Sequence, residues 1–205
     1  MKSHPIQAVK VLPLTVHRTL EDLLTAVRAC RACDGHLPLG PRPVVQAGAT
    51  ARILVVGQAH ESGIPFSDAS GDRLREWMGV SADQFYDESK IAILPMGYCY
   101  PGRAASGDLP PRRECAELWL DQLLAKLPNI ELTLLVGQYA QTHFLRGKGH
   151  STVTATTRDW RVHAPGIIPL PHPSPRNVAW FIANPWFYDE LLPVLRRSID
   201  KLVAP

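Results

Sequence analysis

The sequence predicts an α/β protein, a three-layer α/β/α sandwich around a mostly parallel, four-stranded central sheet. Four short runs rich in valine, isoleucine and leucine, at 51–58, 90–100, 130–137 and 166–173, are typical of strands buried on both faces. Segments with helical spacing of apolar residues lie between these runs, and strands that alternate with helices form parallel sheets. We therefore expect one α/β domain.

The length of 205 residues suits a single domain with an appendage. Residues 1–18 carry no helical or strand-like pattern, so we expect an N-terminal arm there and a folded domain over 19–205. Thr19 is positioned to cap a helix over 20–33, and Ser70 a helix over 70–80.

Three more helices are expected in the second half of the chain. One covers 110–128 and begins with prolines, one follows the glycine turn at Gly137, and one covers 184–202. Asn184 is the expected cap of the last helix, with Pro185 in its first turn.

Composition narrows the classes of function. The apolar content is 45%, and no apolar run is long enough to cross a bilayer. The N-terminus shows no pattern of a signal peptide, so we expect a cytoplasmic protein without a membrane partner. The net charge of +3 permits a nucleic-acid partner without requiring one.

One loop carries much polar chemistry. The stretch LPHPSPRNVAW, 170–180, places His172 between prolines and then brings Ser174, Arg176 and Asn177. Its three prolines exclude a helix through it, and no apolar alternation supports a strand. Ligands of parallel sheets bind beyond the carboxyl ends of the strands. Because GQAHESGIPF and YCYPGR follow two other predicted strands, we expect the three loops to form one site.

Four cysteines indicate a metal centre. Cys30 and Cys33 form a C-x-x-C pair, whereas fifteen residues separate Cys99 from Cys115. A structural disulfide is not expected in the cytosol, and isolated buried cysteines do not explain the close pair. Structural zinc usually takes two close pairs, while four thiolates can hold a [4Fe–4S] cluster without that restriction. The pattern predicts a metal or cluster site, with an iron–sulfur cluster or zinc as the alternatives.

The cysteine spacing and the HPSPRN loop give the chain a family resemblance. It resembles the uracil-DNA glycosylase superfamily over 20–203, and most closely its iron–sulfur members, called family 4. In family 4, four cysteines in this order hold a [4Fe–4S] cluster, which implies a structural cluster here. The histidine loop is similar to that of the single-strand-selective uracil glycosylases. The resemblance implies a DNA-repair glycosylase that binds DNA.

The resemblance also assigns roles to residues. His172 is the catalytic histidine, and Gln58 takes the acidic or amide position of the motif after the first strand. Phe66 is the aromatic side chain that stacks on a base flipped out of DNA. The other residues that it places at the substrate are Gly57, Ala59, Ser174, Arg176 and Asn177.

The sequence departs from the family at two places. Ala59 runs directly into His60 without the Pro-Gly of the family, so the first loop is short. Pro95 stands where family 4 members have an asparagine that reads the edge of uracil. Gln58 has no titratable group and can only orient water or bind an amide edge. Glu61 and Asp68 are the acidic candidates nearby.

Base excision breaks an N-glycosidic bond through a cation-like sugar and a negatively charged leaving base. A rigid His172 that donates a hydrogen bond to the base stabilises that charge. Arg176, with Arg103, Arg112 or Arg113, is expected to bind phosphates.

No lysine lies in these motifs to form a Schiff base, so we expect a monofunctional glycosylase for uracil or another deaminated base, acting as a monomer. One alternative is a non-catalytic binder of damaged or abasic DNA. The other is a hydrolase that acts on free nucleotides.

Overall fold

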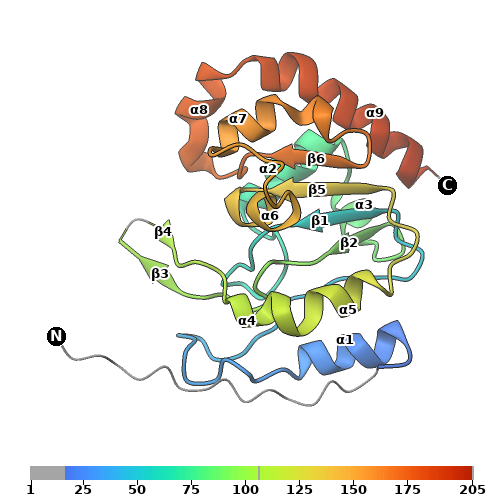
Figure 1. Cartoon of the computed structure of the whole chain (residues 1–205), viewed down its shortest axis with the longest axis vertical. Helices are drawn as coiled ribbons and strands as arrows, with labels where there is room; N and C mark the ends of the chain where they lie inside the picture. The colour runs from blue at the N-terminus through green and yellow to red at the C-terminus, as the bar shows by residue number, and fades with distance from the viewer. Residues whose placement is uncertain (1–16, 106, 205) are drawn as a thin grey trace.

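The computed structural model describes residues 17–105 and 107–204 and shows an α/β fold on a four-stranded sheet (Figure 1). The strand order is β2-β1-β5-β6, and every neighbouring pair is parallel. The predicted architecture is confirmed, and each strand lies inside the apolar run that predicted it. The strands are β1 (Ile53–Val56), β2 (Ile91–Ile93), β5 (Leu132–Val136) and β6 (Ile167–Leu170).

Alternate residues of a strand point to opposite faces, so β1 contributes to two cores. Ile53 and Val55 pack in one core against α2 (Ala69–Met78), α3 (Ala82–Tyr86) and α9 (Leu192–Val203). All the side chains of β1 are buried, which explains its continuous apolar sequence.

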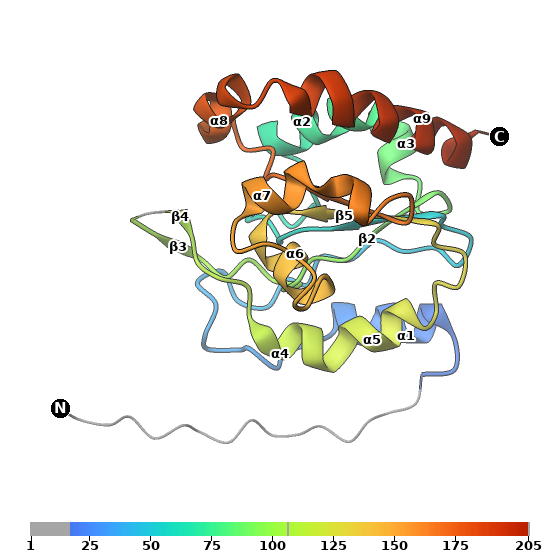
Figure 2. The same ribbon diagram turned by 45° about the horizontal axis from the view of Figure 1, so that its top comes forward.

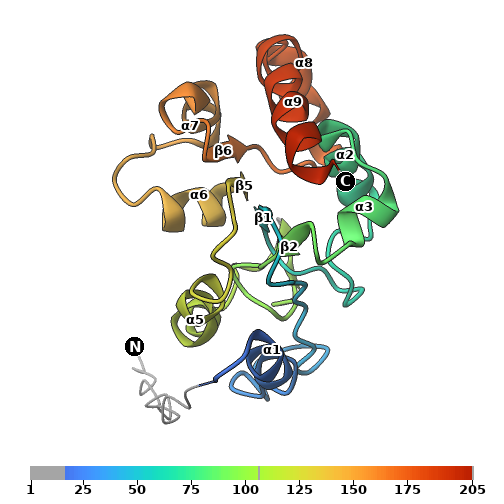
Figure 3. The same cartoon turned by 90° about the vertical axis from the view of Figure 1, so that its right-hand side faces the viewer.

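The second core lies on the other face of the sheet. Leu54 and Val56 pack there with side chains of α1 (Leu20–Arg28), α5 (Asp121–Leu124) and α6 (Gln138–Phe144). Figure 3 shows α1 and α5 on one side of the sheet and α2, α3 and α9 on the other. These helices form the two outer layers of the sandwich.

The first helix begins as predicted. The hydroxyl of Thr19 accepts from the N–H of Asp22 at 3.1 Å, and the Asp22 carboxylate accepts from the N–H of Thr19 at 3.3 Å. This reciprocal pair is a capping box. The helix ends at Arg28, earlier than predicted, because three-residue turns replace the helical hydrogen bonds. Cys30 and Cys33 therefore lie in turns after the helix.

The predicted cap of α2 is wrong by two residues. Asp68, and not Ser70, is the N-cap, because its carboxylate accepts from the N–H of Gly71 at 3.3 Å. Ser70 lies buried in the first turn of the helix. The cap thus places a carboxylate at the mouth of the loop that follows β1.

The predicted helix over 110–128 is present over 113–124 and is not a simple α-helix. It consists of α4 (Arg113–Cys115), a π-helical turn (Ala116–Leu120) and α5. A π-helical turn holds one more residue than an α-helical turn, and such turns are frequent at functional sites. The apolar spacing of the sequence did not reveal it.

The last helix also differs from its prediction. Asn184 does not cap it, because the side-chain oxygen of Asn184 accepts from the indole N–H of Trp186 at 3.0 Å. Asn184 instead follows α8 (Val178–Ala183), which was not predicted. A π-helical turn (Phe187–Leu191) then leads into α9, and Figure 2 shows α8 and α9 along one side of the molecule.

The histidine loop contains one short element, a 3₁₀ turn (Pro175–Asn177), where no helix was expected. A single turn tolerates Pro175 because proline fits the first position of a helical turn.

Three further elements were not predicted: α3, α7 (Val153–Arg158) and a hairpin of β3 (Arg103–Ala104) and β4 (Gly107–Asp108). Strands of two residues are too short to show alternation. Figure 1 shows the hairpin projecting from the body of the molecule.

Of the expected N-terminal arm, residues 1–16 lie outside the described residues. No helix in the described part is long and apolar enough to cross a membrane.

Candidate active site

A pocket of about 360 Å³ lies beyond the carboxyl ends of β1, β2 and β6. Its lining comes from the three loops that the sequence singled out, together with the start of α2 and Asp108 on β4. The volume is typical of a site for a small molecule or a single base. The lining residues are Gln58, Ala59, His60, Glu61, Phe66, Asp68, Ala69, Ser70, Tyr100, Arg103, Asp108, His172, Ser174, Pro175 and Arg176.

The loop that carries His172 is held through its backbone. The side-chain amide of Asn177 donates to the carbonyl oxygen of His172 at 2.8 Å. The guanidinium of Arg73, on α2, donates to the carbonyl oxygens of Pro173 at 3.2 Å and Ser174 at 3.0 Å. Because these bonds fix the backbone at His172 and at the two residues after it, His172 presents a fixed imidazole to the pocket.

The environment of His172 favours the neutral imidazole. Desolvation by the surrounding loops lowers its pKa below the ordinary value of 6.5 although the side chain is exposed at the pocket, and the negative charges of Asp68 and Asp108 only partly offset this effect. A neutral imidazole still carries one N–H donor. His172 can therefore donate a hydrogen bond at neutral pH without carrying a charge.

Phe66 lies beneath the pocket in an unusual backbone conformation. Its φ is 50°, in the left-handed region that non-glycine residues rarely adopt. Its carbonyl oxygen accepts from Arg75 at 3.0 Å and from the hydroxyl of Tyr86 at 3.2 Å. A Cβ on Gly71 would lie 1.7 Å from the same oxygen, and one on Gly57 would lie 2.6 Å from the tip of the ring. The surroundings thus hold a strained residue in place, as is common at functional sites.

The amide of Gln58 is oriented by the hairpin. Its Nε2 donates to the carbonyl oxygen of Leu109 at 2.8 Å, just after β4. The N–H of Leu109 in turn donates to the carbonyl of Gly102 at 2.8 Å, at the base of the hairpin. This arrangement leaves Oε1 of Gln58 as the free acceptor of the amide.

Asp68 brings a carboxylate to the pocket opposite a histidine. Burial alone would raise the pKa of Asp68, but the hydroxyl of Ser70, the nearby His60 and the N–H groups of Gly71 and Ser70 lower it below the ordinary value. The N–H of Ser62 donates to Nδ1 of His60 at 3.3 Å. Nε2 of His60 lies 3.9 Å from the Asp68 carboxylate.

Tyr100 and two arginines complete the rim. The hydroxyl of Tyr100 donates to Asp108 at 3.3 Å, and burial together with the Asp108 charge raises the pKa of the phenol. Arg103 and Arg176 also line the pocket. The guanidinium of Arg176 reaches the hairpin, within 3.8 Å of where a Cβ on Gly107 would lie.

The structure brings most of the expected site residues together. His172, Gln58, Phe66, Ala59, Ser174 and Arg176 all line the pocket. Gly57 lies under the Phe66 ring, and Asn177 supports the backbone of the histidine loop from behind.

Other expected residues lie elsewhere, and some pocket residues were missed. Arg112 and Arg113 line a separate groove, whereas Arg103 reaches the pocket. His60, Tyr100 and Asp108 line the pocket without having been assigned a role. Tyr100 lies in the YCYPGR segment that the sequence singled out, so its position after a strand was the available signal.

The four cysteines come from three segments and carry free thiols. Cys33 and Cys99 pack together in a small buried cluster with Leu37. Burial raises the pKa of Cys115 to about 12, the backbone N–H of Tyr98 opposes this, and the charges of the other three thiols raise it further. These thiols therefore lie within electrostatic reach of one another.

Their arrangement does not match that of a single-ion site. Within 17–105 and 107–204, no group of three or more His, Cys, Asp or Glu side chains is arranged to hold a metal ion. Four soft thiols on three segments remain the donor set that an iron–sulfur cluster requires.

Fold and pocket together define a class: an α/β sandwich with a histidine loop at the carboxyl ends of parallel strands. The model of the uracil DNA glycosylase superfamily matches residues 45–196. The chain belongs to the uracil-DNA glycosylase superfamily, whose members are generally DNA glycosylases that act as hydrolases. The matched range contains the whole pocket and begins after the C-x-x-C pair.

Proposed function

We propose that this chain is a monofunctional DNA glycosylase that removes uracil or another deaminated base. The observation that carries the proposal is the pocket that places a neutral His172 and an ionised Asp68 around the ring of Phe66. A pocket of this size can receive one base only after that base leaves the DNA stack.

The floor and one wall of the pocket suit a flipped base. The ring of Phe66 offers a planar apolar surface, and stacking on an aromatic side chain stabilises a bound base by about 1–3 kcal/mol. Oε1 of Gln58 is free to accept from the imide N–H of uracil, because its Nε2 is engaged by Leu109. Gln58 thereby binds the edge of the base, a role that belongs in family 4 to the asparagine whose position Pro95 occupies here.

His172 acts on the leaving base. Negative charge develops on the base as the N-glycosidic bond breaks, and a fixed N–H donor at the base oxygen stabilises it. The lowered pKa keeps this imidazole neutral, so it donates a hydrogen bond and does not bind the product base as a charged pair. The backbone bonds from Asn177 and Arg73 hold the ring in position.

Asp68 acts on the sugar and the attacking water. Its lowered pKa keeps it ionised, and a carboxylate stabilises an oxocarbenium-like sugar. The N–H of Gly71 donates to the carboxylate at 3.3 Å and holds it at the pocket, and Nε2 of His60 lies 3.9 Å from it. Asp68 thus supplies a carboxylate to the pocket, because Gln58 and Ala59, in the motif after the first strand, have no acidic side chain. No lysine is present among the lining residues of the described chain, which supports attack by water and not by an amine.

We further infer that Cys30, Cys33, Cys99 and Cys115 hold a [4Fe–4S] cluster and that the chain is of the family 4 type. A cluster would supply a structural link between the turns after α1 and the segment around β2 and α4, and no step of base excision involves it. Zinc at about 2.3 Å from each sulfur needs a closer set of thiols than a four-iron cluster does. The wide spacing of Cys99 and Cys115 in the sequence favours the cluster over zinc, because structural zinc usually takes two close pairs.

The test uses anaerobically purified full-length protein and end-labelled DNA, single- and double-stranded, carrying uracil, hypoxanthine or xanthine. Alkali cleaves the strand wherever a base has been lost. We expect cleavage at one of these lesions, and the same substrate treated with His172→Gln protein is the matched control.

Three other results would each contradict part of the proposal. Tight binding of abasic DNA without base release would make the chain a non-catalytic lesion binder. Base release from free deoxyuridine but not from DNA would make it a nucleotide hydrolase. A colourless protein with stoichiometric zinc, prepared without air, would rule out the cluster.

A further inference from the structure

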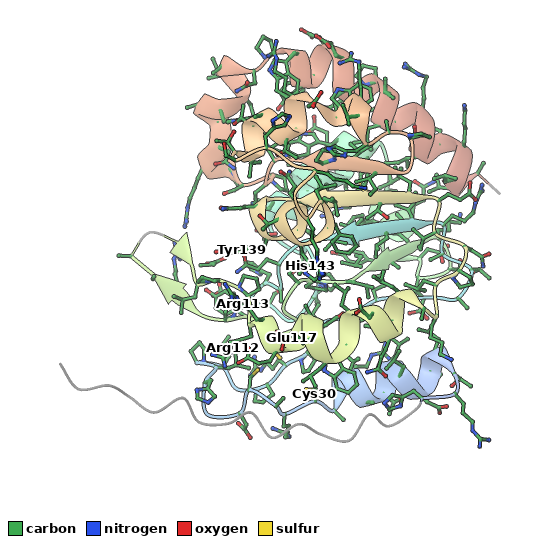
Figure 4. All side chains as sticks on the ribbon, viewed as in Figure 1. Cys30, Arg112, Arg113, Glu117, Tyr139 and His143 are labelled. Carbon is green, nitrogen blue, oxygen red and sulfur yellow. The ribbon has the colours of Figure 1, made fainter. Side chains whose placement is uncertain are left out.

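A second groove, of about 600 Å³, lies on the face of the molecule that carries α1 and α5. One side is the segment 110–117, which includes α4 and enters the π-helical turn, and the other side is α6. Figure 4 shows Tyr139 and His143 on α6 facing Arg113 and Glu117 on the opposite side. None of these residues has a role in the pocket around His172.

The groove carries two arginine side chains that stand outside the ion pairs of the described residues. Arg113 and Arg146 both line it, and neither forms an ion pair with a described residue. Arg112 is already paired with Glu114. Glu117 lines the groove and the charge of Asp121 reaches His143, so these carboxylates offset part of the positive charge. Nε of Arg146 donates to the carbonyl oxygen of His143 at 3.2 Å, which leaves the two terminal amino groups of Arg146 for a phosphate.

The same groove offers an aromatic and apolar surface between these charges. Tyr139 is 40% exposed although its ring is large and apolar. Met96, Pro110 and Pro111 line the groove beside it. His143 contributes an uncharged imidazole, because burial and the neighbouring Arg146 lower its pKa and Asp121 only partly opposes them. An aromatic ring between cations is the arrangement that binds single-stranded nucleic acid.

The groove is continuous in sequence with the wall of the active-site pocket. A Cβ on Gly137 would lie 3.7 Å from the imidazole of His172, so Gly137 touches the catalytic loop. The next residue, Gln138, already lines the groove. The lining of the groove on α6 therefore begins one residue after a glycine that contacts the histidine loop.

We propose that the groove binds a single DNA strand that extends from the flipped nucleotide, with Arg113 and Arg146 on its phosphates and Tyr139 stacked on one base. The inference rests on the proposed action on DNA and adds a second contact region to it. It explains why a chain with a short first loop still has cationic and aromatic surface beyond its pocket.

The test measures binding of undamaged single strands by fluorescence anisotropy. One oligonucleotide is short and only spans the pocket, and another extends well beyond it on both sides. The Arg113→Gln/Arg146→Gln double variant should bind the long strand about tenfold more weakly and the short strand as the original protein does. The slope of log Kd against log salt for the long strand should fall by about 1.4, since each phosphate contact on a single strand contributes about 0.7.

Two further variants separate stacking from charge. Tyr139→Ala should weaken binding of the long strand about tenfold, and Tyr139→Phe should restore it because the ring is retained. Arg197→Gln is the matched control for charge, since Arg197 is exposed on α9, on the opposite face of the sheet. Circular dichroism and Tm of each variant check that the fold is retained.

An unchanged affinity and salt slope in the double variant would overturn the proposal. Equal losses of affinity for the short and the long strand in the double variant would also overturn it. Binding of polyglutamate that is as tight as that of the long strand and depends equally on the two arginines would overturn it too, because it would indicate an acidic peptide as the occupant. Base release from the short substrate is assayed separately. If the protein releases the base but its binding does not depend on the groove, only the proposal for the groove is contradicted. If binding depends on the groove but no base is released, only the proposed glycosylase activity is contradicted.

Discussion

The pocket and the cysteine-bearing segment are held in place by different means. Backbone carbonyls of the pocket loops are bound by Arg73, Arg75 and Asn177, and the ring of Phe66 packs into the core of the sheet. The segment 29–43 is instead a series of short turns whose buried side chains form only a small cluster around Cys33.

Because of this difference, we expect the cysteine-bearing segment to depend on the proposed cluster for its order and the pocket not to depend on it. Hydrogen bonds within the protein hold the loops of the pocket, so we expect their geometry not to depend on the proposed cluster. The segment 29–43 has little apolar surface to bury, and small regions of this kind rely on metals or disulfides for order. Substitutions in the pocket should change the rate of base release, whereas substitutions of cysteine should change local order.

The largest effect is expected from His172→Gln. Glutamine keeps a polar side chain but does not place a donor where the imidazole N–H lies, so base release should slow by about 10²–10³-fold. Single-turnover kinetics on the preferred substrate measure this loss. An unchanged Tm and an unchanged visible spectrum would show that the cysteine segment is unaffected, and an unchanged rate would remove His172 from the mechanism.

Asp68→Asn is expected to slow base release by about a hundredfold. Asparagine is as good an N-cap as aspartate, so α2 should keep its stability while the pocket loses a negative charge. Asp68→Ala is the companion variant, because it also removes the cap and should lower the free energy of unfolding by about 1 kcal/mol. If Asp68→Asn retained full activity, Glu61 would become the next candidate for the same role.

Cys115→Ser tests the other region. Loss of one cluster ligand should abolish absorbance near 400 nm and loosen the turns around Cys30 and Cys33. Trypsin should then cut at Arg31, which is exposed, about tenfold faster than in the original protein. His172→Gln is the control, and equal cleavage of the two variants would mean that this segment does not depend on the cluster.

Gly57→Ala should have a smaller effect, confined to the pocket. Its Cβ would lie 2.6 Å from the tip of the Phe66 ring, which must shift into the space of the base. We expect kcat/KM to fall about tenfold, the size of one lost stacking contact. Gly149→Ala is the control, because a Cβ there meets its nearest neighbours at 3.5 Å. Equal rates for the two variants would argue against Phe66 as the stacking platform.

The smallest effect is expected from a change of pH near neutrality, where kcat/KM should hardly vary. In the proposed mechanism neutral His172 and ionised Asp68 are the active forms, and both pKa values lie below their ordinary values of 6.5 and 3.8. The value of kcat/KM should therefore stay level down to pH 6.5 and fall only at lower pH, as His172 gains a proton. In His172→Gln the remaining fall should move to the still lower range of Asp68. A fall centred at or above pH 6.5 in the original protein would contradict the assignment.

Much of the sheet and of the pocket could be predicted from the sequence. The four strands are continuous apolar runs because both faces are covered, and Thr19 caps α1 with Asp22 as its reciprocal partner. The convergence of three loops followed from the rule that ligands bind at the carboxyl ends of parallel strands.

The parts that were missed depend on contacts that local patterns do not encode. Several residues before α2 can serve as a cap, and only the geometry of the loop selects Asp68 over Ser70. Asn184 lost its expected capping role because the indole of Trp186 takes its oxygen. The hairpin that orients Gln58 is too short to leave a periodic signal.

The π-helical turn at Ala116–Leu120 sets the direction in which Cys115 points. A single extra residue in a helix rotates everything before it by roughly 100° relative to everything after it. Removing one residue from this turn would restore a regular α-helix and leave Leu123 facing the sheet, while the sulfur of Cys115 would swing about a quarter turn away from the other three thiols. The extra residue therefore lets one helix keep its apolar side on the sheet while Cys115 stays on the side of the other three thiols, where the proposed cluster would bind.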